Sequence, residues 1–120
     1  MRAIFTSFAL MLASALPVRA DLPLACEGSN PDWYLTYAGP VAVLDFGRKT
    51  QFDIPQRSVA EGRADWPRAY TLIAEADTAI LLVDEVACET PHGRFPIRAH
   101  VLTQRGQTPI LLTGCCTVAE

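Results

Sequence analysis

Four cysteines constrain the fold of this chain more than any other feature, because two of them are adjacent. Cys115 and Cys116 end an apolar segment near the C-terminus, whereas Cys26 and Cys88 lie near the start and the middle of the chain that follows residue 20. Adjacent residues on a strand point to opposite faces, so a bond between Cys115 and Cys116 is unfavourable. We expect each of these two to bond a different partner, one of them Cys26 and the other Cys88.

Residues 1–20 have the pattern of a secretory signal peptide. Arg2 precedes a mostly apolar run of 13 residues, and Val18-Arg19-Ala20 suits cleavage before Asp21. The run is shorter than the ~20 apolar residues that a membrane-spanning helix needs. We therefore expect export, with the mature protein in the periplasm or secreted.

A lipid anchor is the alternative to a free exported protein. Leu24-Ala25-Cys26 has the form of the end of a lipobox, which would attach lipid to Cys26. Pro23 and the distance from the apolar run argue against this reading. We expect membrane association only if Cys26 is lipidated.

The chain after residue 20 has 100 residues, which is enough for one small domain, residues 21–120. Its core is modest, and each disulfide adds ~2–4 kcal/mol by restricting the unfolded chain. Four cysteines in an exported domain of this size indicate two disulfides. Removal of Arg2 and Arg19 changes the net charge from −3 to −5. No basic stripe remains, so nucleic acid is not an expected partner.

Short apolar and alternating segments separated by turn residues predict an all-β domain. Phe52 and Ile54 alternate with Gln51 and Asp53, which is the period of a half-buried strand. We expect a small antiparallel β-barrel, or a strongly curved sheet, of about seven to eight strands stapled by disulfides, because a barrel leaves no exposed edge. The expected strands cover residues 33–38, 41–46, 50–54, 68–75, 78–88, 95–102 and 108–116; the expected loops cover residues 26–33, 55–67 and 89–94, with a tight turn at residues 105–106.

Residues 68–75 and 78–88 are expected to form a hairpin. A two-residue turn at Ala76-Asp77 would place Tyr70 opposite Val83 and Arg68 opposite Glu85. Each of these pairs would add ~0.2–1 kcal/mol.

The run Ile80-Leu81-Leu82-Val83 is apolar on both faces of its strand. Such a run suits a central strand, or a strand that is covered on its outer side.

Acidic residues gather in the same region, at Asp77, Asp84, Glu85 and Glu89. Calcium prefers oxygen-rich loops, but the Asp-x-Asp-x-Asp-Gly spacing is absent. A solvated acidic face is the better interpretation.

Cys88, His92, Cys115 and Cys116 are an alternative set of zinc or copper(I) ligands, or of redox thiols. This set would leave Cys26 unpaired, and the chain has no Cys-x-x-Cys motif. Gly-x-Ser-x-Gly and His-Glu-x-x-His motifs are also absent from the sequence. We therefore expect no catalytic residue, no cofactor and no metal.

Aromatic and arginine side chains are the candidates for partner binding, because Trp, Tyr and Arg dominate interface hot spots. Trp66 lies in the loop at residues 55–67, and we weigh core packing and binding equally for it; Trp33 is expected in the core. The candidate binding residues are Trp66, Arg57, Arg63, Arg68 and His92.

Two stretches resemble a family of small exported bacterial proteins, many of them assigned as lipoproteins. Residues 26–33, Cys-Glu-Gly-Ser-Asn-Pro-Asp-Trp, resemble the family's Cys-x-Gly-x-Glu-Pro-Phe-Trp opening. Cys88, Phe95-Pro96 and the closing Gly114-Cys115-Cys116 stand in the matching order. Asn30 and Asp32 depart from the pattern, and residues 89–94 lack the family's Asp-Gly-Met-Ser-Asp loop. The resemblance implies export, disulfides and a small β-domain, and it implies no activity.

Together these features predict an exported, non-enzymatic β-barrel module that binds a protein or another component of the cell envelope. A metal-binding or thiol-redox protein that uses Cys88, His92, Cys115 and Cys116 is the alternative.

Overall fold

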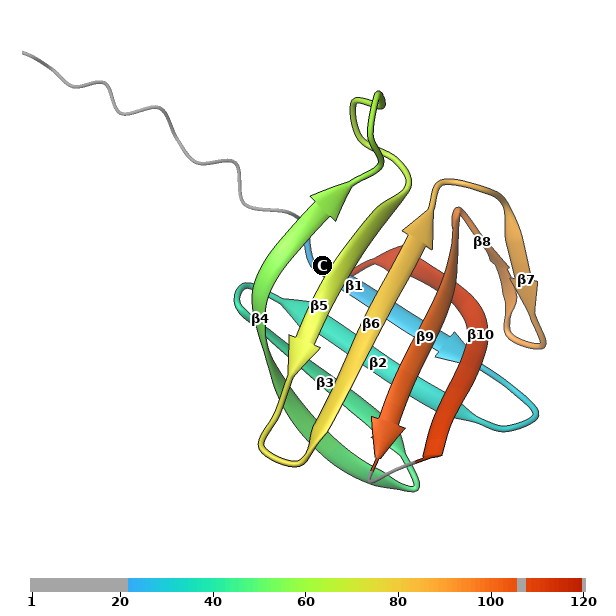
Figure 1. Ribbon diagram of the computed structural model, residues 1–120. Helices are drawn as coiled ribbons and strands as arrows, with labels where there is room; N and C mark the ends of the chain where they lie inside the picture. Colours follow the sequence, from blue (N-terminus) through green and yellow to red (C-terminus); the bar gives the residue numbers. More distant parts are fainter. Residues whose placement is uncertain (1–21, 106–107, 120) are drawn as a thin grey trace, which may run out of the picture.

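Eight antiparallel strands close into a barrel in the computed structural model, which describes residues 22–105 and 108–119 (Figure 1). The order around the barrel is β1-β10-β9-β6-β5-β4-β3-β2, and β7 and β8 form a separate hairpin. The expected all-β fold is therefore confirmed. The expected signal peptide and residue 106 of the expected turn lie outside the described residues. The strands are β1 (Leu24–Gly28), β2 (Trp33–Ala38), β3 (Val41–Phe46), β4 (Arg48–Val59), β5 (Arg68–Ile73), β6 (Asp77–Asp84), β7 (Cys88–Thr90), β8 (Gly93–Phe95), β9 (Ile97–Arg105) and β10 (Thr108–Val118).

Alternate side chains along each strand point into and out of the barrel. On β6, Ala79, Leu81 and Val83 are buried, whereas Ile80 and Leu82 between them are exposed. The same alternation on the neighbouring strands fills the interior with aromatic and aliphatic side chains. Removing this surface from water, at about 25 cal/mol per Å², is the main stabilising contribution. The described residues contain no helix that is long and apolar enough to cross a membrane.

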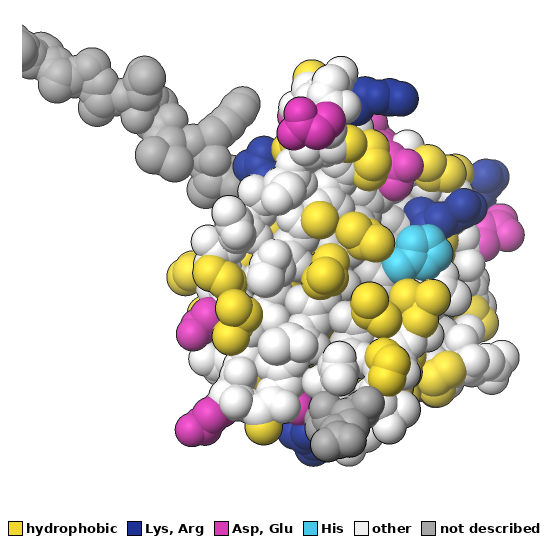
Figure 2. Space-filling model, in the orientation of Figure 1, with side chains coloured by type: hydrophobic (Ala, Val, Ile, Leu, Met, Phe, Trp, Pro, Cys, Tyr) yellow, Lys and Arg dark blue, Asp and Glu magenta, His cyan; other side chains and the backbone are white. Residues whose placement is uncertain are grey.

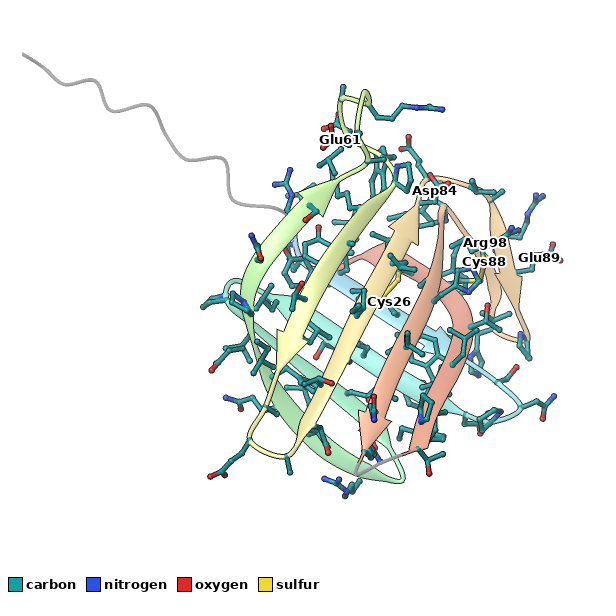
Figure 3. All side chains as sticks on the ribbon, viewed as in Figure 1. Cys26, Glu61, Asp84, Cys88, Glu89 and Arg98 are labelled. Carbon is teal, nitrogen blue, oxygen red and sulfur yellow. A yellow bond between two sulfur atoms is a disulfide. The ribbon has the colours of Figure 1, made fainter. Side chains whose placement is uncertain are left out.

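Two disulfides form, and the adjacent cysteines have different partners, as expected. Cys26 bonds Cys116, its register partner across β1 and β10. Cys88 bonds Cys115 and so joins β7 to the barrel. Figure 3 shows the two bonds at different places, one beneath the strands and one beside β7. One disulfide closes the barrel, and the other fastens the β7–β8 hairpin to its outside.

The prediction of a loop at residues 26–33 is wrong for residues 26–28, because they belong to the strand β1. It pairs with β2 on one side and with β10 on the other. The local sequence contains the turn-forming residues Gly28, Asn30 and Pro31, and for this reason the strand was not predicted. In the structure, only residues 29–32 form the turn. The strand that sequence reasoning missed is the one that closes the barrel.

The loop expected at residues 55–67 is also shorter in the structure. β4 continues to Val59 and pairs there with β5, after an irregularity between Asp53 and Gln56. Pro55 has no N–H group for a strand ladder and therefore favours a loop, but a bulge accommodates it. The remaining loop covers residues 60–67.

The expected hairpin of β5 and β6 exists, but its expected register is wrong by two residues. Tyr70 pairs with Leu81, and Arg68 pairs with Val83. The turn is centred earlier than expected, so Asp77 becomes the first residue of β6. Many residue types fit such a turn, and composition alone did not locate its centre.

The loop expected at residues 89–94 is instead most of the β7–β8 hairpin. Cys88 pairs with Phe95, and Thr90 pairs with Gly93. Strands of three residues are too short to show a period of two, which explains the wrong prediction.

Candidate functional site

Residues next to the cysteines of β1 and β10 pack around Trp33, which is 1% exposed. Its indole N–H donates to the carbonyl of Thr113 (3.0 Å). A Cβ at Gly28 would lie 2.0 Å from Nε1 of Trp33, and a Cβ at Gly114 would lie 2.0 Å from the carbonyl oxygen of Glu27. Only glycine fits at both positions. The prediction that Trp33 belongs to the core is confirmed, and these segments serve packing where β1, β2 and β10 meet.

Trp66 has the packing role that was weighed for it, and its role in binding stays a prediction. Its ring is half-buried and packs against the core, and the guanidinium of Arg68 lies 4.1 Å from the ring centroid. Arg68 also donates through Nε to the carbonyl of Asp65 (2.8 Å) and through Nη1 to the hydroxyl of Tyr70 (3.5 Å). This pair caps the barrel beneath the loop at residues 60–67, so it contributes to folding as well as to the surface.

The other expected binding residues lie on separate elements. Arg57 is exposed on β4, and Arg63 is exposed in the loop. His92 lies at the tip of the β7–β8 hairpin, away from that loop in Figure 1. Among the five candidates, Trp66 and Arg68 are in ring contact with each other.

His92 forms an ion pair with Glu27 of β1, through Nδ1 and Oε2. The hydrogen bond to Glu27, followed by the negative charge of the same carboxylate, raises the pKa of His92 above 6.5. Thr90 donates to that carboxylate (3.1 Å), and its hydroxyl accepts from the backbone N–H of His92 (3.0 Å). Thr90 does not donate to the imidazole, so the three groups form no nucleophile–base relay. They hold the hairpin on β1.

Sequence reasoning missed Glu27 as the partner of His92. The two residues are 65 positions apart, and no local motif connects them. Only the docking of the hairpin on β1 brings them together.

The alternative metal or redox set is not available as thiolates in this structure. Cys88 and Cys115 bond each other, and Cys116 bonds Cys26. Within residues 22–105 and 108–119, no group of three or more His, Cys, Asp or Glu side chains is placed to hold a metal ion. The sulfur that a lipid anchor would need, that of Cys26, is part of a disulfide as well.

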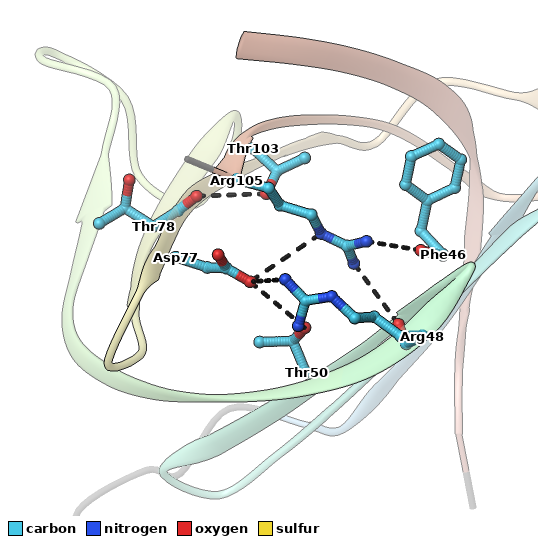
Figure 4. Close-up of polar contacts among 7 residues, drawn as sticks. All are labelled: Phe46, Arg48, Thr50, Asp77, Thr78, Thr103 and Arg105. Carbon is cyan, nitrogen blue, oxygen red and sulfur yellow. Dashed lines mark hydrogen bonds and ion pairs between the residues drawn. The ribbon is translucent and has the colours of Figure 1, made fainter. Parts of the chain in front are cut away.

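The expected solvated acidic face is wrong for Asp77, whereas Glu85 and Glu89 are exposed as expected. The side chain of Asp77 is 4% exposed and lies inside one end of the barrel (Figure 4). The carboxylate accepts from Nη2 of Arg48 (3.1 Å) and from the hydroxyl of Thr50 (3.4 Å), and it lies 3.9 Å from Nε of Arg105. The N–H of Ala74 donates to the carbonyl of Asp77 (2.9 Å), which fixes the earlier turn and points this side chain inward.

Arg105 spans this end of the barrel. It donates through Nη1 to the carbonyl of Phe46 (2.6 Å) and through Nη2 to the carbonyl of Arg48 (3.4 Å). Its Nε is buried and makes no hydrogen bond to the described residues. A buried carboxylate is costly unless it is paired, and here two guanidiniums compensate Asp77. The cluster closes the barrel end and is structural, because most of its donors point to protein acceptors.

An exposed apolar surface covers the outside of β5, β6, β9 and β10. Ile80, Leu102 and Leu111 are paired in register across three strands and form one row. Leu111 is 66% exposed, and the flanking Ile73 and Leu82 are 45% and 44% exposed. Figure 2 views this surface and shows hydrophobic side chains over its middle, with the acidic and basic side chains towards the margins. We name it the β6–β9 face and define it by the outward-facing side chains of residues 69–73, 78–84, 98–104 and 109–113.

Charge is confined to one end of the β6–β9 face. Asp84 and Arg98 are its acidic and basic members, and they are register partners across β6 and β9. The outward-facing His100 follows Arg98 on the same face of β9 and is the register partner of Leu82. A shallow groove of about 300 Å³ lies towards the other end, between side chains that include Ile73, Thr78 and Leu102. The run at residues 80–83 is central in the sheet, as expected, but the described residues do not cover its outer side.

Comparison of the chain with protein-family models, with curated proteins and with solved structures found no match in any of the three.

Proposed function

We propose that this protein is an exported, non-enzymatic β-barrel module that binds a protein or another component of the cell envelope. The observation that carries the proposal is the β6–β9 face. Antiparallel sheets that face water normally place polar side chains outside, whereas this one presents Ile80, Leu102 and Leu111 there. The largest apolar patch on a soluble monomer is often a contact surface. The cores of such contacts are depleted of charge, as the middle of this face is.

Export is supported by two independent features. The pattern of residues 1–20 is that of a cleavable leader. The two disulfides are consistent with an oxidising, extracytoplasmic compartment.

Loop residues supply a second set of contacts in this proposal. Arg57, Arg63, Trp66 and Arg68 surround the loop end of the barrel, and His92 marks the hairpin. Loops on a rigid scaffold commonly carry recognition, so these residues would add selectivity to the apolar contact.

The proposal is tested by capture from envelope extract on the immobilised protein. Leu102→Lys places a charge in the middle of the β6–β9 face and is expected to weaken capture at least ~10-fold. Tyr34→Lys is the matched control, because Tyr34 is 45% exposed on β2, outside the face. Circular dichroism checks that both variants are folded. Equal capture by Leu102→Lys and the wild type would remove the face from the proposed function.

A further inference from the structure

We infer that the partner on the β6–β9 face is a second copy of this chain, related to the first by a two-fold axis that runs parallel to the strands along the seam between β6 and β9. The inference rests on the proposed function, because it takes the same face to be a contact surface, and it names the occupant. Closed dimers with a two-fold axis are the commonest protein assemblies, and they require a surface that is complementary to itself.

The register of β6 with β9 supplies that complementarity. Ile80 is paired with Leu102, and Asp84 is paired with Arg98. A two-fold axis along the seam places β6 of one copy over β9 of the other at the same height along the strands. Each Ile80 then faces a Leu102, each Leu82 faces a His100, and each Asp84 faces an Arg98. Every favourable contact therefore occurs twice.

The two charged side chains select this orientation of the axis. Neither Asp84 nor Arg98 forms an ion pair within the described part of the chain. Figure 3 shows both towards the same end of the face, near the β7–β8 hairpin. An axis perpendicular to the strands would instead bring this end against the end with Gln104, and the charges would remain unpaired. The parallel axis joins each carboxylate to a guanidinium of the other copy.

The outer strands fit the same axis. Thr71 is in register with Ile80, and Leu111 is in register with Leu102. The axis therefore places β10 of one copy over β5 of the other, with Leu111 above Thr71. Thr71 lines the groove of about 300 Å³, and Leu111 is the most exposed apolar side chain of the face. A projecting leucine thus meets the margin of the groove.

The size of the face indicates a weak dimer. Strand spacing of ~4.8 Å and a rise of ~3.3 Å per residue give a footprint of roughly 20 Å by 25 Å. That is about 500 Å² for each copy, below the ~800 Å² of a standard stable interface. Dimerisation is therefore expected at micromolar or higher protein concentration. Self-association must accordingly be measured over a series of protein concentrations.

Sedimentation equilibrium of the protein with both disulfides intact, from ~10 μM to ~1 mM, tests the inference. The wild type is expected to shift from monomer towards dimer over this range. Asp84→Arg opposes two arginines across the axis, and Arg98→Asp opposes two aspartates, so each variant alone is expected to self-associate at least ~10-fold more weakly. An equimolar mixture of the two variants restores both opposite-charge pairs between copies and is expected to regain the wild-type association.

The mixture separates the contact between copies from any effect within one chain. Mixing cannot repair an intrachain contact of Asp84 with Arg98, so recovery identifies the axis. A wild type that stays monomeric at ~1 mM, or a mixture no stronger than its components, overturns the inference. Tyr34→Lys should dimerise like the wild type, whereas Leu102→Lys should not.

The two proposals fail separately. If the protein is monomeric and Leu102→Lys still abolishes capture of an envelope component, the face binds a different partner, and only the inference is lost. If the protein dimerises as described and Leu102→Lys leaves envelope capture unchanged, the inference stands and the proposed role of the face is lost.

Discussion

Gly114 has no room for a side chain, because β1, β10 and the ring of Trp33 meet around it. A Cβ there would lie 2.0 Å from the carbonyl oxygen of Glu27 and 2.8 Å from the ring of Trp33. Backbone cannot move aside as a flexible side chain can. The glycine before the two cysteines is therefore a packing requirement of the barrel junction.

Gly114→Ala is expected to lower the free energy of unfolding by at least ~2 kcal/mol, because the added methyl group must displace the β1 backbone. Urea unfolding followed by circular dichroism measures the change. Thr113→Ala is the control, since that side chain is exposed and only its carbonyl contacts Trp33; its effect should stay within ~0.5 kcal/mol. Equal stability of Gly114→Ala and the wild type would contradict the close approach.

The ion pair of His92 with Glu27 predicts a pH dependence for the docking of the hairpin. The pKa of His92 is raised in the folded protein, so the pair's contribution is fully present below pH ~6.5 and is lost as pH rises through the folded-state value. NMR titration of the His92 ring in the wild type and in Glu27→Gln measures this directly. The pKa of His92 should fall towards its ordinary value in the variant, and an unchanged titration would show that Glu27 is not its partner.

At the scale of the secondary-structure elements, the two disulfides connect different parts of the fold. Cys26–Cys116 joins the strands that close the barrel, whereas Cys88–Cys115 holds a hairpin that lies outside the barrel sheet. The sequence separations are 90 and 27 residues. In the chain-entropy model these separations correspond to about 4.6 and about 3.6 kcal/mol of stabilisation.

Replacement of each pair by alanine should therefore give different results in amide hydrogen exchange. Without Cys88–Cys115, amides of β7 and β8 should lose protection, while those of β6 and β9 remain among the best protected. Without Cys26–Cys116, protection should fall throughout the barrel. Loss of protection confined to β1 in the second variant would mean that the barrel does not depend on this closure.

Several elements could be predicted from local sequence, and others depend on contacts that local sequence does not reveal. The bounds of β2 and β3 agree with the alternating segments at residues 33–38 and 41–46. β1 lies between Pro23 and the turn at residues 29–32, and its strand character comes from pairing with β10, more than eighty residues later along the chain. Asp77 appeared to be in a turn until the register was known.

The candidate site was the least predictable part. Apolar residues on both faces of β6 correctly indicated a central strand, but the pattern could not show that its outer face is open. The neighbours that extend this surface, Leu102 and Leu111, come from β9 and β10 and join β6 only through the sheet register. The candidate binding residues named from the sequence, such as Trp66 and Arg63, lie in the loop at residues 60–67 and not on this wall.

At the scale of the whole molecule, closure of the sheet decides how a partner can approach. In the described barrel each of the eight strands has a neighbour on both sides, so no barrel strand edge is open for an added strand. The described strands that keep an open edge are those of the separate β7–β8 hairpin, whereas the barrel itself offers side chains on its outer wall or at its ends. The Asp77 cluster occupies one end of the barrel, and Trp66 packs against the core next to the loop at residues 60–67, so the outer wall is the surface with exposed apolar side chains.

The bond between Cys26 and Cys116 also makes most of the chain a covalent ring. A protease that cuts the exposed loop at residues 60–67 opens this ring but releases no fragment, because both pieces stay joined through the two sulfurs. The barrel strands on either side of the cut keep their partners. Such a nicked molecule would separate into two pieces only after reduction. In an oxidising compartment, a cut in this loop would therefore leave the two parts of the barrel joined.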